Sequence, residues 1–207
     1  MGTCGGWCEG DPVAWRQFAD LGAMPLELGG HLPQVRVAYE TWGEFDGKNA
    51  VLVQHALTGD AHAAGPAGEG QATAGWWDAL IGPGKAIDTD RWFVLSSNVL
   101  GGCQGTTGPS STAPDGRAYG SRWPRITIRD QVAVEVALAD ALGIERFTAV
   151  MGGSMGGMRT LEWMVQHPQR VGGALVMATS ASATADQIAT QNIQIAAIQA
   201  DPDWRAG

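Results

Sequence analysis

One serine stands in the pattern of this sequence that is best suited to chemistry. The apolar run 147–151 predicts a short buried strand, two glycines end it, and a helical pattern begins directly after Ser154. Strand, sharp turn, serine and helix together form the nucleophile elbow G-x-S-x-G. A serine at the apex of such a turn has a strained backbone, so Gly152 and Gly156 are expected to let other backbone approach without a Cβ in the way. We predict that Ser154 is a nucleophile at the positive end of a helix.

Two backbone amides are predicted to receive the negative charge that such a nucleophile creates. The N–H of Met155, the residue after the serine, points to where an oxyanion would form. The buried strand 50–54 runs into a loop at 55–62, and in serine hydrolase folds this loop supplies the second donor. We predict that the second donor is the amide of Leu57.

Both assignments have plainer alternatives. The glycine-rich turn could simply pack tightly or cradle a phosphate, although neither G-x-G-x-x-G nor a Gly-Lys-Ser/Thr ending is present. The loop at 55–62 could be an ordinary strand exit with two incidental histidines. His55 and His62 precede the serine, whereas the general base of this fold comes last in the chain, so we do not expect either to be catalytic.

Composition narrows the class of protein. The chain has 207 residues, 30 of them glycine, and a net charge of −8, which argues against a nucleic-acid surface. No apolar run approaches the roughly 20 residues of a membrane span, and no signal sequence is evident, so we expect a cytoplasmic protein. Three cysteines give no even disulfide framework. Cys4 and Cys8 have the spacing of half a metal site. The sequence has no second Cys or His pair to complete that site, so no metal is expected.

Alternating strand and helix patterns predict the architecture. Strands are expected at 35–41, 50–54, 92–97, 147–151 and 174–177, and helices at 127–142, 155–166 and 184–200. Thr127 and Asp130 resemble a capping box for the first helix, and Gly143 should end it. The irregular stretch 98–125 is expected to form a wall of the cleft.

These elements predict an α/β-hydrolase fold, with a mostly parallel sheet and helices on both faces. We divide the chain into a disordered lead (1–20), the front part of the hydrolase core (21–183) and the start of a helical lid (184–207).

Several stretches, taken together, resemble the homoserine O-acetyltransferases of methionine biosynthesis. They are HALTGD at 55–60, GWW at 75–77, SNVLGGC at 97–103, GTTGP at 105–109, IRD at 128–130, GGSMGG at 152–157 and ADQ at 185–187. The resemblance implies an acyltransferase that moves the acetyl group of acetyl-CoA to L-homoserine through an acetyl ester on Ser154. Acetyl-CoA would be a co-substrate, and no permanently bound cofactor is implied. The family's lid also pairs two subunits, which implies a homodimer of the full-length protein.

The resemblance covers only the front part of that family. Its triad aspartate and histidine follow later strands, so we expect a sheet truncated before its last strands and a chain that could be inactive alone. Homoserine succinyltransferase, serine acetyltransferase or an esterase of the same fold stay as alternatives. Thr58 favours acetyl over succinyl, because the family's succinyl enzymes carry serine in a related loop. A non-catalytic fragment is the remaining alternative.

Overall fold

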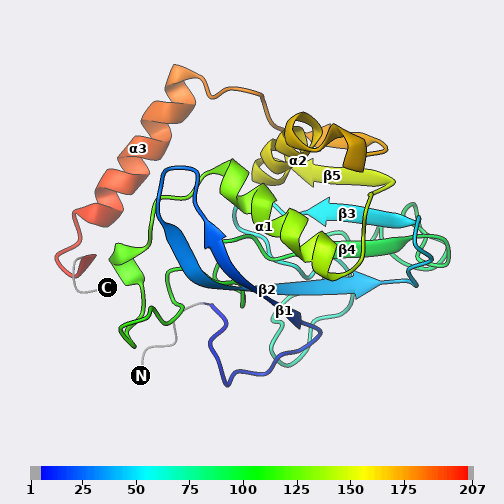
Figure 1. Cartoon of the computed structure of the whole chain (residues 1–207), viewed down its shortest axis with the longest axis horizontal. Coiled ribbons are helices and arrows are strands. Elements are labelled where there is room, and N and C mark those ends of the chain that lie inside the picture. The colour runs from blue at the N-terminus through cyan, green and yellow to red at the C-terminus, as the bar shows by residue number, and fades with distance from the viewer. Residues whose placement is uncertain (1–5, 205–207) are drawn as a thin grey trace.

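A six-stranded sheet forms the centre of the computed structural model, which describes residues 6–204 (Figure 1). The strands are β1 (Gln17–Pro25), β2 (His31–Trp42), β3 (Ala50–Gln54), β4 (Phe93–Ser97), β5 (Ala149–Gly153) and β6 (Ala174–Met177). The helices are α1 (Ile128–Ala141), α2 (Met155–Gln166) and α3 (Ala185–Gln199), with short 3-10 turns η1 (Gly120–Arg122) and η2 (Pro168–Arg170). Every strand and helix expected from the sequence is present, with ends shifted by a few residues.

The strand order is β1-β2-β4-β3-β5-β6. β4, β3, β5 and β6 are parallel, and β1 and β2 add an antiparallel edge. All five residues of β3 are buried, as expected for a central strand covered on both faces. The predicted fold class is therefore confirmed.

The two faces of the sheet are covered differently. On one face, Leu52 and Leu95 pack in a core cluster with Leu138 of α1 and Trp163 of α2. Their neighbours point to the other face, where they pack against residues of the irregular segment 61–92; this cluster includes Val51, Val53, Val94, Ile81 and Ile87. The expectation of helices on both faces thus holds for one face only in the described residues. The segment 61–92 contains six glycines and two prolines, which interrupt it too often for a regular helix to form.

The ends of α1 follow the predicted signals. Thr127 accepts a hydrogen bond from the Asp130 amide, and the Asp130 carboxylate accepts one from the Thr127 amide, which confirms the capping box. Gly143 follows the helix at φ 71°, and Ile144 N–H donates back to Ala139 O, as in a Schellman motif.

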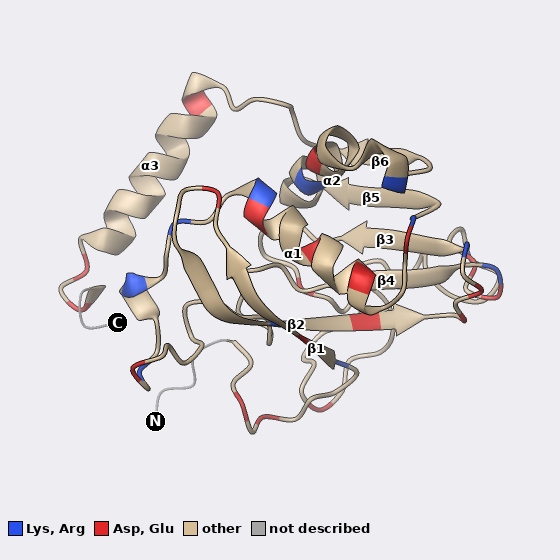
Figure 2. Ribbon diagram, viewed as in Figure 1, with Lys and Arg blue, Asp and Glu red and all other residues tan. Residues whose placement is uncertain are grey.

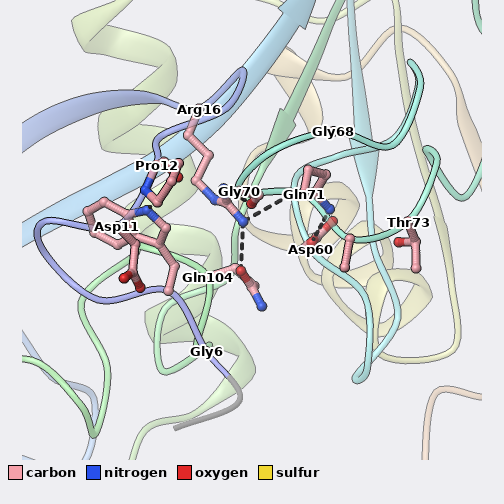
Figure 3. A pocket seen from close by; sticks show the side chains of 12 residues that line it. Gly6, Asp11, Pro12, Arg16, Asp60, Gly68, Gly70, Gln71, Thr73 and Gln104 are labelled. Atoms are coloured by element: carbon pink, nitrogen blue, oxygen red, sulfur yellow. Dashed lines mark hydrogen bonds between the residues drawn. The ribbon is translucent and has the colours of Figure 1, made fainter. Parts of the chain in front are cut away.

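The disordered lead predicted for residues 1–20 is wrong where the structure describes it. β1 begins at Gln17, and Arg16 is buried, with its guanidinium donating to Gln71 Oε1 at 3.0 Å and Gln104 Oε1 at 2.7 Å (Figure 3). The pattern at 13–28 carries no strand signal, because it is mixed and is interrupted by Gly22 and Pro25. In the structure Gly22 has φ +72° at a register shift between β1 and β2, so it is a bulge inside the hairpin. Residues 1–5 lie outside the described part.

α3 confirms the predicted helix at 184–200 and stands away from the sheet (Figure 1). All of its residues are exposed, and its one charged residue is Asp186 in the first turn (Figure 2). No helix within residues 6–204 is long and apolar enough to cross a membrane. The role of α3 as the start of a lid stays a prediction.

Candidate active site

Ser154 lies at the junction between β5 and α2. Its backbone has φ 54° and ψ −122°, a region that non-glycine residues rarely adopt, and its side chain is exposed. Such a conformation costs about 1–3 kcal/mol and persists only where surrounding contacts hold it. One such contact is the hydrogen bond of 3.0 Å that Ser154 N–H donates to the carbonyl of Met177 in β6.

Glycines let the turn close around this serine. A Cβ on Gly152 would overlap the carbonyl group of Gly156, and a Cβ on Gly156 would overlap the carbonyl oxygen of Gln54 at the end of β3. A Cβ on Gly157 would lie 2.6 Å from Thr179 Cγ2. The start of α2 therefore sits directly on the backbone of two strand ends, which a larger residue would prevent.

Leu57 and Met155 line the same cleft, which has a volume of about 550 Å³. Leu57 is the second residue of a turn closed by a hydrogen bond of 3.0 Å from Gly59 N–H to Ala56 O. Its side chain is 67% exposed, and neither its amide nor that of Met155 donates a hydrogen bond within residues 6–204. The structure thus places the two residues singled out as oxyanion donors on the walls of one cleft.

The cleft walls come from three segments. They are the loop after β3 (57–60), the loop after β4 (99–104) and a side wall of Trp123, Ile126 and Gln131. Part of the irregular stretch predicted to be a wall does line the cleft. Gln131 is buried, and its Oε1 has no hydrogen-bond partner in the described residues.

His55 holds the loop after β3 in place. Its Nδ1–H donates to Ala56 O at 2.7 Å, and its Nε2 accepts from the Val99 amide at 3.1 Å, an arrangement that requires the neutral ring. Burial, with a smaller effect from the positive charge of Arg159, lowers the pKa of His55 to about 3. His55 is therefore a structural residue that joins two cleft walls.

The ring of His62 also has partners in the structure. Its Nδ1 lies 2.8 Å from the buried carboxylate of Glu40, and its ring stacks on Trp15. Burial raises the pKa of Glu40 above its ordinary value. No hydrogen bond joins Ser154 to a histidine in residues 6–204, which agrees with the expectation that neither histidine is its base.

A buried polar network beneath the elbow was not predicted. Arg159 and Glu135 form an ion pair, and Glu135 Oε2 accepts from Gln54 Nε2 at 2.6 Å and Trp163 Nε1 at 2.8 Å. Thr160 Oγ1 donates to Gln54 Oε1 at 2.6 Å. The available signal was a charged residue inside the apolar stripe of each helix, and nothing in the sequence by itself pairs the two.

Metal ligands are not gathered in the described residues: no group of three or more His, Cys, Asp or Glu side chains is close enough to hold an ion there. Of the two cysteines considered for a metal site, Cys4 lies outside the described part.

Comparisons with known proteins agree with this geometry. A family profile described as "alpha/beta hydrolase fold" matches residues 49–207. The chain is 62% identical over 205 residues to a homoserine O-acetyltransferase of Clavibacter michiganensis, covering 98% of this chain and 53% of that protein. The chain therefore spans about half the length of the curated relatives it matches.

Solved structures give the same architecture. A homoserine O-acetyltransferase from Bacillus anthracis superposes with a TM-score of 0.82 at 32% identity, covering 93% of this chain and 54% of that one. Esterase E22 superposes with a TM-score of 0.84 at 35% identity, covering 93% and 55%.

Proposed function

Because this chain belongs to the α/β-hydrolase fold family, we propose that Ser154 carries an acetyl group from acetyl-CoA to the hydroxyl of L-homoserine. The observation that carries the proposal is the exposed serine at φ 54° between β5 and α2, directly before Met155, which lines one cleft together with Leu57. The similarity to homoserine O-acetyltransferases supplies the substrates.

The reaction proceeds in two displacements. Ser154 Oγ attacks the thioester carbonyl, the C–S bond breaks, and CoA leaves with a proton as its thiol. The hydroxyl of homoserine then attacks the acetyl ester, and Ser154 recovers its hydroxyl as O-acetylhomoserine forms. Both steps pass through a tetrahedral oxyanion, and splitting the transfer replaces one difficult encounter with two easier ones.

The two amides supply the electrostatic part of this mechanism. Each preorganised donor to the oxyanion contributes about 3 kcal/mol in comparable serine enzymes. No general base is hydrogen-bonded to Ser154 within residues 6–204. In this mechanism these residues supply the nucleophile, the oxyanion donors and the cleft.

We extend the proposal to the co-substrate, the cellular location and the oligomeric state of the protein. Acetyl-CoA acts as a co-substrate with no resident cofactor, and the enzyme works in the cytoplasm. α3 begins a lid that pairs two subunits. Its exposed isoleucines support this pairing: Ile188, Ile193, Ile195 and Ile198.

The test is a rapid-mixing experiment on the protein expressed from its complete reading frame. Acetyl-CoA alone should release a burst of CoA equal to the enzyme concentration and leave one acetyl group on Ser154, detected by peptide mass spectrometry. Added homoserine should discharge that group as O-acetylhomoserine. A protein that releases no CoA and gains no acetyl group would refute the proposal.

An esterase is the second candidate, favoured by the likeness to esterase E22. It would use the same serine and amides but admit water to the acetyl-enzyme. Equal hydrolysis of simple acetyl esters with and without homoserine, and no preference for a CoA thioester, would identify it. Serine in place of homoserine, and succinyl-CoA in place of acetyl-CoA, test the other acceptor and donor in the same assay.

A further inference from the structure

Arg159 joins the helix that carries the serine to the loop that carries the second oxyanion donor. The guanidinium is fully buried, and its Nη2 donates to the backbone carbonyl of His55 at 2.7 Å. Arg159 lies on α2, which begins directly after Ser154, and His55 directly precedes the turn that contains Leu57. One side chain therefore connects the two halves of the proposed oxyanion site.

Glu135 of α1 holds this guanidinium in place. Its Oε1 pairs with Arg159 Nη1, and its Oε2 accepts from Gln54 and Trp163. Because both oxygens have partners from other elements, the carboxylate cannot rotate without leaving a buried polar group unpaired. Arg159 thereby bonds to Glu135 through one terminal nitrogen and to His55 through the other.

His55 connects Arg159 to the turn that contains Leu57. Its carbonyl is held by Arg159, while its ring bonds to Ala56 O and to the Val99 amide. Ala56 O also accepts the Gly59 N–H that closes the turn. His55, which precedes this turn, is thus bonded to Arg159 of α2 and to Val99 of the loop after β4.

We propose that Arg159, held by Glu135, is a positioning residue that sets the direction of the Leu57 N–H relative to Ser154. This inference rests on the proposed function of Ser154 and Leu57. A charged donor makes a stronger hydrogen bond to a carbonyl than a neutral one does. Oxyanion donors act by being preorganised, so a small rotation of the turn reduces transition-state stabilisation while leaving substrate binding in place.

The test removes the bond to His55 without leaving a lone buried charge. Breaking a buried ion pair by removing one partner is strongly destabilising, so the variant is the double substitution Arg159→Met with Glu135→Gln. The amide introduced at position 135 would still offer an oxygen to Gln54 and Trp163. We expect kcat for CoA release from acetyl-CoA to fall about 10- to 100-fold, with KM for acetyl-CoA changed less than about twofold.

Two further variants complete the design. Arg159→Lys keeps the charge beside Glu135 but lacks the second arm that reaches His55, so it should show the same loss of kcat at unchanged KM. Arg129→Met is the matched control, because Arg129 also pairs with carboxylates, those of Glu27 and Glu162, but it is exposed and its partners in the described residues do not include His55. It should keep the wild-type kcat and KM.

Phosphonylation of Ser154 by a fluorophosphonate provides a readout that is independent of acetyl transfer. That reaction also develops negative charge on an oxygen that faces the proposed oxyanion donors. A wild-type protein that is labelled but transfers no acetyl group would refute the proposed function, and the labelling rates of the variants would still decide the role of Arg159. Wild-type labelling and kcat in both the double variant and Arg159→Lys would overturn the inference. So would a kcat loss accompanied by an equal rise in KM, which indicates a general disturbance of the fold.

Discussion

Gly156 of α2 lies against the backbone carbonyl of Gln54 at the end of β3, so closely that a Cβ there would overlap the oxygen. The elbow is usually described by what its glycines allow around the serine. Here the second glycine of the motif also sets how near α2 comes to the strand that leads into the loop of Leu57. The distance between Ser154 and Leu57, the proposed oxyanion donor, thus depends on this backbone contact.

Substituting this glycine should therefore disturb both stability and activity. Gly156→Ala should lower the free energy of unfolding by roughly 1–3 kcal/mol, because the new methyl group meets backbone that cannot move aside cheaply. Gly153→Ala is the matched control, since the nearest atom to its Cβ would be Met177 O at 3.9 Å. Urea unfolding of both variants measures the difference, and equal stability would show that α2 can shift at no cost.

Ser154 should be replaceable without loss of stability. Ser154→Gly and Ser154→Ala should both abolish acetyl transfer. Only glycine adopts φ 54° freely, so Ser154→Gly should be more stable than the wild type by roughly 1 kcal/mol, and Ser154→Ala should not. Thermal melts and a CoA-release assay check this. A stabilised alanine variant would mean that the hydroxyl, not the backbone, carries the strain.

Local signals in the sequence were sufficient to predict most helices and strands. The capping box at Thr127 and the left-handed Gly143 predicted the ends of α1 correctly, because both depend on residues a few positions apart. The strand, the turn at Ser154 and the helix that follows were predictable for the same reason. β1 was missed because a glycine within it resembles a strand breaker, and only pairing with β2 turns it into a bulge.

The buried network could not be predicted in the same way. Arg159 and His55 are far apart in the chain, and their contact depends on how α2 packs on β3. His55 was excluded as a base on chain order, and its role in joining Ala56 and Val99 depends on the path of the loop after β4. Such long-range polar contacts need the fold before they can be seen.

Protonation of His55 should destabilise the fold as the pH falls. Its folded pKa of about 3 lies below the ordinary value of 6.5, so the unfolded state takes up the proton first. The contribution of neutral His55 is full above pH 6.5 and is lost progressively as the pH falls towards 3. The slope from this one group approaches about 1.4 kcal/mol per pH unit.

The measurement compares urea midpoints at pH 7 and pH 5 for the wild type and His55→Gln. The variant should be less stable at pH 7, because it keeps at most one of the two ring hydrogen bonds, but it should lose less stability between the two values. His31→Gln, at an exposed position in the hairpin of β1 and β2, should show the wild-type dependence. Identical pH dependence in His55→Gln would contradict a neutral, buried ring.

The amide of Leu57 can be removed without removing the turn that presents it. Leu57 is the second residue of the turn from Ala56 to Gly59, a position where proline is favoured, and proline has no N–H. Leu57→Pro should therefore keep the fold and the affinity for acetyl-CoA while lowering kcat about 100- to 1,000-fold. Leu57→Ala should retain most activity, because the side chain is largely exposed and only the backbone is proposed to act. Steady-state kinetics with a thermal melt of each variant separates the outcomes. If Leu57→Pro folds and turns over like Leu57→Ala, the second oxyanion donor must be another group.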